Sequence, residues 1–210
     1  MHSRFLTRTF LTTLIIWGVL VVCFSLASLR FHPKEIRYDG VFYFIQLRSL
    51  HFDGDFDFRN EAERFPWVTR TFGTPLADGR LANPFAIGSA ILWTPFYGLA
   101  DGYCHVRNLF LHTPYNCNGY IACYVKAVII GTAFWSATGV LLLTLAIKRL
   151  GGRVGLAGMT TIALVLSSPL VFYILFEADY AHGNAFFTIA LLCTARWRLK
   201  TARGSCWRMP

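Results

Sequence analysis

The chain has 210 residues, of which 55% are hydrophobic and 15% are charged, and its formal net charge is +9. Soluble globular domains contain about 25% charged residues, so this composition excludes an ordinary soluble domain and predicts an integral membrane protein. The basic residues stand at the ends of the apolar runs, where they set membrane orientation, and this pattern argues against nucleic acid as a partner.

The first apolar run, residues 9–29, follows two arginines and is long enough to cross a bilayer, which takes about 20 residues. A Ser-Leu-Ala tripeptide near its end is similar to a signal-peptidase site, so a cleaved signal peptide is the alternative to an uncleaved anchor. The apolar part exceeds the roughly 7 to 15 residues of a signal peptide, which favours the anchor. In both cases the segment that follows is exported.

An acidic residue, Asp39, stands before an aromatic and apolar run from Gly40 to Phe52. Such a run is typical of a helix that lies on a membrane surface. Asp39 therefore has two interpretations. It is either an ordinary helix N-cap that accepts backbone N–H bonds, or a functional acid at the membrane edge.

Two patterns in the loop could suggest bound metal. The stretch Asp53–Phe58 begins like a calcium loop, but an EF-hand needs Gly at position six and Glu at position twelve, where this chain has Phe58 and Arg64. Cys104 and Cys117 lie thirteen residues apart in an oxidising setting, which allows a disulfide without requiring one. The sequence predicts no metal site and no cofactor, and it leaves open whether a divalent metal takes part.

The segment from Asn83 to Ala100 is apolar but contains two prolines, so it either crosses the membrane or lies at its surface. If it crossed, the basic cluster at residues 148–153 would lie outside, against the positive-inside rule. If it lies in the interface or dips in and returns, the basic clusters lie inside and every acidic residue lies outside. We therefore predict that this segment does not span.

The resulting prediction is an all-α integral membrane protein with about four transmembrane helices and a long exported first loop that contains short interfacial helices. The N-terminus would be cytoplasmic, and Pro169 would kink the third span. The predicted spans are residues 9–29, 121–147, 154–176 and 180–197, with the exported loop at about 30–120 and a basic cytoplasmic tail at 200–210.

Three polar residues, Glu177, Asp179 and His182, stand at the exported boundary where the third predicted span ends and the fourth begins. Ionisable groups at this position are costly and mark functional sites, although they are also stable when they are simply hydrated beyond the hydrocarbon. The layout places this turn on the same side of the membrane as Asp39. We therefore expect the two acidic segments to meet.

Several stretches occur in an order that resembles the GT-C class of bacterial membrane glycosyltransferases, close to the protein mannosyltransferases and aminoarabinose transferases. They are YDGVFYFIQLRSLHFDGDFDFRNE, then PLADGRLANPFAIGSAILWTPFY, then SSPLVFYILFEADYAHGNAFF. The resemblance implies a bacterial inner-membrane location, a polyprenyl-phosphate sugar donor, an exported acceptor, and a catalytic acid at Asp39. The turn looks like a Glu-x-x-x-Ser-His motif of that class, with Glu177 and His182 matching and Ala181 in place of Ser.

The leading hypothesis is an inverting sugar transfer in which Asp39 accepts the proton of the attacking hydroxyl. The substrate-binding residues would be Glu177, Asp179, His182, Arg70, Arg80 and Asn83. The arginines could hold phosphate, because a guanidinium matches phosphate oxygens, or they could pair with neighbouring carboxylates as most surface charges do.

Two other functions stay open. Residues 1–199 resemble only the N-terminal part of such an enzyme, and the final basic stretch does not resemble it, so the chain could be a truncated and inactive membrane fragment. It could also be a small membrane scaffold or a transport-associated subunit. Besides membrane lipids and the lipid-linked donor, small-residue helix faces would allow a second copy or another subunit to associate.

Overall fold

The computed structural model describes the backbone of residues 2–32, 35–72, 75–111, 114–150 and 153–206, and side chains within these ranges from residue 11 to residue 196. Over these ranges the chain is helical and has no strand, which confirms the all-α prediction. The helices are α1 (His2–Phe31), α2 (Asp39–Arg48), α3 (Arg59–Arg64), α4 (Thr69–Phe72), α5 (Gly88–Phe110), α6 (Ala122–Arg149), α7 (Val154–Leu166), α8 (Leu170–Leu175) and α9 (His182–Cys206). A short π-helix, Ser49–Asp53, extends α2, and a 3-10 turn, Pro66–Val68, precedes α4.

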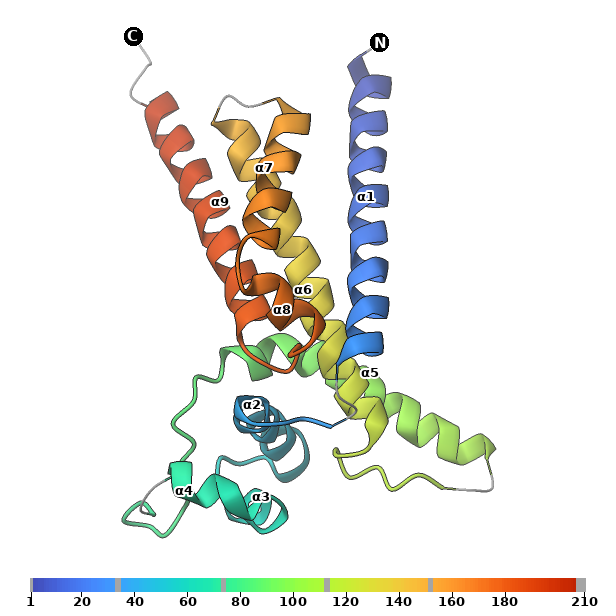
Figure 1. Cartoon of the computed structure of the whole chain (residues 1–210), viewed down its shortest axis with the longest axis vertical. Coiled ribbons are helices and arrows are strands. Elements are labelled where there is room, and N and C mark those ends of the chain that lie inside the picture. The colour runs from blue at the N-terminus through green and yellow to red at the C-terminus, as the bar shows by residue number, and fades with distance from the viewer. Residues whose placement is uncertain (1, 33–34, 73–74, 112–113, 151–152, 207–210) are drawn as a thin grey trace.

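The long helices form a bundle in which the chain runs alternately between two ends (Figure 1). Helix α1 leads away from the end that holds both termini, α6 returns, α7 and α8 lead away again, and α9 returns. Helices α2 to α5 gather at the opposite end. Among the described residues, Leu11–Phe31 and Ala122–Arg149 are long and apolar enough to cross a membrane, with mean hydropathies of 2.2 and 1.9.

Helix α6 is the centre of the bundle, since it packs against α1, α5, α7 and α9. Its contact surface is built from small side chains, which lets neighbouring backbones approach closely. Ala133 and Ala137, which stand one helical turn apart, are fully buried. Gly139 leaves room for Phe186 of α9, whose ring would lie 2.8 Å from an added Cβ.

The predicted third span, residues 154–176, is not one helix. It is broken into α7 and α8 at Ser167–Pro169, so the predicted kink is a complete interruption. Pro169 has no N–H to donate to the preceding turn, and Ser168 competes with the helix by accepting a hydrogen bond from the Leu170 N–H at 3.3 Å.

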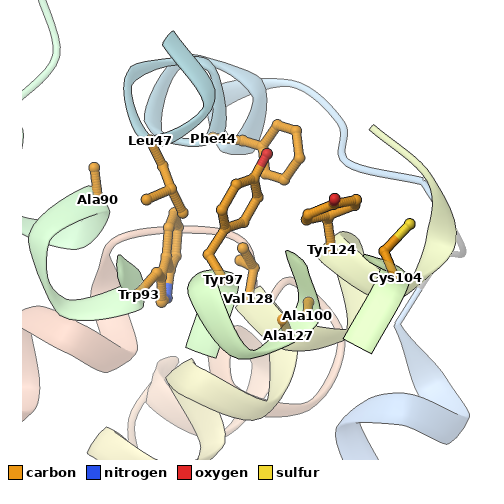
Figure 2. Close-up of a cluster of buried hydrophobic side chains, with 10 residues drawn as sticks. All are labelled: Phe44, Leu47, Ala90, Trp93, Tyr97, Ala100, Cys104, Tyr124, Ala127 and Val128. Atoms are coloured by element: carbon orange, nitrogen blue, oxygen red, sulfur yellow. The ribbon is translucent and has the colours of Figure 1, made fainter. Parts of the chain in front are cut away.

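Helix α5 lies across the end of the bundle instead of running along it (Figure 1). One stripe of α5 is buried against α2 and α6, and Figure 2 shows Trp93 and Tyr97 of that stripe between the two helices. The Trp93 indole N–H donates to Thr132 Oγ1 at 2.9 Å, and the Tyr97 hydroxyl donates to the Gly119 carbonyl at 2.8 Å.

The connection between α5 and α6 is closed by the Cys104–Cys117 disulfide, which settles the pairing that the sequence left open. Cys104 is fully buried at the end of the α5 stripe. The bridge therefore holds the start of α6 against α5.

Removal of this bridge by Cys104→Ser with Cys117→Ser should lower the free energy of unfolding by about 2 to 4 kcal/mol, because the unfolded chain gains loop freedom. Denaturant unfolding in detergent measures the change. Cys193→Ser is the matched control, since Cys193 is a free, exposed cysteine of α9 and should leave the stability nearly unchanged. Equal stabilities for the double variant and the control would contradict the structural role of the bridge.

Candidate functional site

The carboxylate of Asp179 connects the turn before α9 to the end of α1 and to the backbone just before α2, both more than 140 residues earlier in the sequence. Its Oδ1 lies 3.0 Å from Nε2 of His32 at the end of α1, and both side chains are only 1% exposed. Its Oδ2 accepts a hydrogen bond of 3.1 Å from the backbone N–H of Arg37, just before α2. A buried carboxylate is stable only with such partners. The bonds therefore fix the 177–182 turn against the start of α2.

Gly40 is required for this contact, because a Cβ added to it would lie 2.1 Å from Asp179 Oδ2. The backbone reaches this position through a tight turn, in which the Gly40 N–H donates to the Arg37 carbonyl at 3.0 Å. Tyr38 occupies the first central position of the turn with φ 47° and ψ −129°, values that favour glycine. The backbone is therefore strained at Tyr38, the residue immediately before Asp39.

Asp39 is the first residue of α2 and is exposed, and its negative charge affects the pKa of two tyrosines. Burial raises the pKa of Tyr43, one turn later in α2, and the Asp39 carboxylate raises it further. Burial also raises the pKa of Tyr180 to about 12, with contributions from the carboxylates of Glu177 and Asp39. The expected meeting of Asp39 with the 177–182 turn is therefore present in the fold.

Glu177 is half-buried at the edge of the same cluster. Burial raises the pKa of its carboxyl group, and the charge of Asp179 adds to this rise, while His32 and Arg37 lower it in part. A carboxyl group with a raised pKa protonates more readily than one in water. The 177–182 turn thus contains a carboxyl group that takes up a proton more readily than one in water.

A cavity of about 330 Å³ lies between α5 and α9, and Tyr43 lines it. Its polar wall is Asn184, a residue only 2% exposed whose amide nitrogen and oxygen have no partner within the described structure. Gly88 and Ser89, at the start of α5, line it as well, and helix N-termini attract anions through their free N–H groups. The cavity can hold a polar or anionic group among apolar walls.

Two further cavities, of about 330 and 540 Å³, adjoin each other and share Glu35, Ile36 and Phe65 as walls. Val41 of α2 lines the larger of these two cavities, whereas Tyr43 of α2 lines the cavity beside α9. Residues two apart in a helix point to different faces, so α2 separates the cavity pair from the cavity lined by Tyr43. Their remaining polar and aromatic walls are Arg37, Arg64, Tyr38, Phe44, Trp67 and Tyr120.

The other residues assigned to substrate binding have varied positions. Asn83 holds the loop together, since its side-chain amide donates to the Phe42 carbonyl at 2.6 Å. Arg80 pairs at 2.7 Å with Asp78 in an exposed turn, which is the ordinary surface pairing that the sequence left open. Arg70 is exposed in the short helix α4.

Asp179 and His182 have different surroundings. Asp179 is enclosed and bonded within the protein, where it holds the 177–182 turn in position. His182 is exposed, and its ring lies 3.8 Å from the ring of Tyr173. Its side chain stays available at the start of α9.

Sequence reasoning missed His32, Gly40, Tyr43 and Asn184. His32 immediately follows an apolar run, and Gly40 follows Asp39, so both had a local signal: a titratable group at a helix end and a glycine beside an acid. The sequence contains no such local signal for Tyr43 and Asn184, because the cavity that they line depends on the packing of α5 against α9. No group of three or more metal-ligating side chains occurs among the described residues.

Comparison with family models, with curated proteins and with solved structures finds no match to this chain. The site is therefore interpreted from its own geometry.

A second buried acid, Glu61 of α3, lies in the loop region near α2. Its side chain is 0% exposed, and Oε1 accepts a bond of 3.0 Å from Arg48, which also pairs with Asp53. Its Oε2 has no partner within the described part of the chain. Burial raises the pKa of Glu61 to about 7, although Arg48 opposes this rise.

Gly40→Ala should destabilise the protein by about 1 to 3 kcal/mol, because the added methyl group collides with the Asp179 carboxylate. Gly98→Ala is the matched control, since nothing lies within 4 Å of a Cβ at this position in α5, and the change should stabilise by up to about 1 kcal/mol. Denaturant unfolding compares the two variants. Equal effects would refute the close contact between α2 and the turn.

Glu61 should make stability decrease as the pH rises from about 5 to 7. An acid whose folded pKa lies above its unfolded value binds more protons when folded, so the folded state loses stability between the two values. The difference of about 2.5 units between 4.5 and about 7 corresponds to roughly 3 kcal/mol.

Unfolding of the wild type and of Glu61→Gln at pH 5 and pH 7 isolates this contribution, because the other titrating groups are shared. The variant should lose less stability over this interval than the wild type. Parallel pH dependences would show that Glu61 titrates normally.

Proposed function

We propose that this protein is a membrane glycosyltransferase, or the N-terminal part of one, that transfers a sugar from a polyprenyl phosphate to an acceptor on the exported side of a bacterial inner membrane. The observation that carries the proposal is the position of Asp39. It stands at the start of α2, which separates an apolar cavity beside α9 from an aromatic and polar cavity pair on the other face. Such a position suits an acid that acts between a lipid-borne donor and a water-borne acceptor.

The proposed topology has four crossings: α1, α6, the combined α7 and α8, and α9. Residues 30–121 and the 177–182 turn would face the exported side, and both termini would face the cytoplasm. The common location of α2 to α5 and the turn at one end of the bundle supports this assignment (Figure 1). So do Lys148 and Arg149, which lie at the opposite end of α6.

In the proposed reaction, Asp39 accepts the proton of the acceptor hydroxyl. The oxygen of that hydroxyl forms a bond to the anomeric carbon of the donor sugar. The bond between that carbon and the phosphate oxygen breaks, and the lipid phosphate leaves with the electron pair. The Asn184 amide and the free N–H groups at the start of α5 could stabilise the charge on this phosphate. Glu177, with its raised pKa, could take up the proton afterwards.

Asp39→Asn should lower the transfer rate by about 10² to 10⁴-fold, the usual contribution of a general base. Transfer from a radiolabelled lipid-linked sugar by the purified chain in vesicles measures it. Asp78→Asn is the control, since Asp78 lies in an exposed turn and pairs with Arg80. Full activity of Asp39→Asn would remove this residue from the mechanism, and absence of transfer by the wild type would favour an inactive fragment or a scaffold.

A further inference from the structure

Helix α5 has two apolar faces, of which only one is used inside the protein. The second face is a stripe at helical spacing, formed by Leu99, Tyr103, Val106 and Phe110, and all four side chains are exposed. Leu99 is 74% exposed and Phe110 is 78% exposed. A soluble surface rarely carries such a continuous stripe, whereas a helix lying in a membrane interface requires one.

A cavity of about 610 Å³ opens beside this stripe, between α5 and the start of α6. Leu99 and Tyr103 form one side of it, so the cavity continues the exposed apolar face. The other side belongs to α6, one of the two helices that are long and apolar enough to cross a membrane. The remaining walls are Phe96, Ala100, Tyr115, Ile121, Ala122, Cys123, Ala127 and Ile130.

One cation lines this cavity. Lys126 is exposed in the second turn of α6, and no carboxylate of the described residues forms an ion pair with it. The nearby acid Asp101 is already engaged, because it accepts a bond of 2.6 Å from the Tyr124 hydroxyl and lies 3.2 Å from His51. Lys126 also lies close to the N-terminal end of α6, where the helix dipole favours an anion.

We infer that this cavity, defined here as the α5–α6 groove, binds an anionic phospholipid. Its acyl chain would lie along the apolar walls next to Leu99 and Ile130, and its phosphate would contact Lys126 at the start of α6. Apolar walls with a single cation at the level of a helix N-terminus match the two parts of such a lipid. This assignment does not depend on sugar transfer, because the groove shares no residue with the three cavities next to α2 except Ala122.

The test measures binding of phosphatidylglycerol and of phosphatidylcholine to the full chain in detergent by native mass spectrometry. The wild type should prefer phosphatidylglycerol. Lys126→Gln should reduce its affinity for that lipid about fivefold, the attraction of one lysine near an anionic headgroup. Arg153→Gln is the matched control, because Arg153 is an exposed cation next to α7 at the other end of the bundle.

A second variant, Ala122→Trp, separates the groove from its charge. Ala122 is exposed at the rim, so the larger side chain should obstruct the groove while sparing the core, and binding of phosphatidylglycerol should fall although Lys126 remains. Equal binding by the wild type and both variants would overturn the inference. Displacement of the lipid by millimolar inorganic phosphate would show a free-anion site, and preferential displacement by polyprenyl phosphate would show a donor site.

Discussion

The bonds of Asp179 are the constraint on which the candidate site depends. One buried carboxylate, in the turn before α9, binds the end of α1 and the backbone before α2, which both lie more than 140 residues earlier. Each partner satisfies one oxygen, and loss of either would leave a buried acceptor without a donor, which costs more than the bond itself contributes. The position of Asp39 relative to the 177–182 turn therefore follows from a contact in which Asp39 takes no part.

Helix α6 determines the rest of the arrangement. Its small side chains bring α1 and α9 close, and its start supports α5, which the disulfide holds in place. Helix α5 consequently borders two cavities: the one lined by Asn184 near its start and the α5–α6 groove along its middle. A single helix across the bundle end can thus present a site close to Asp39 and a separate lipid contact.

The sequence predicted the features that depend on local pattern. Apolar length identified α1 and α6 as helices long enough to cross a membrane. The roles of Asp39 and Glu177 stay predictions, made because carboxylates beside apolar runs are costly. The role of Asp179 could not be predicted, since it depends on His32, 147 positions away. The break at Pro169 was underestimated for a different reason: the competing hydrogen bond of Ser168 adds to the loss of the proline N–H.

The strained turn before α2 connects these observations. A residue other than glycine with a positive φ costs about 1 to 3 kcal/mol and persists only where its surroundings enforce it. The residues on both sides of Tyr38 hold it in this conformation. The N–H of Arg37 donates to the Asp179 carboxylate, and Gly40 lies against the same carboxylate. The strain is thus sustained by the link between α1 and the 177–182 turn. Loss of this link would remove the contacts that hold Tyr38, and with it the start of α2, in this conformation.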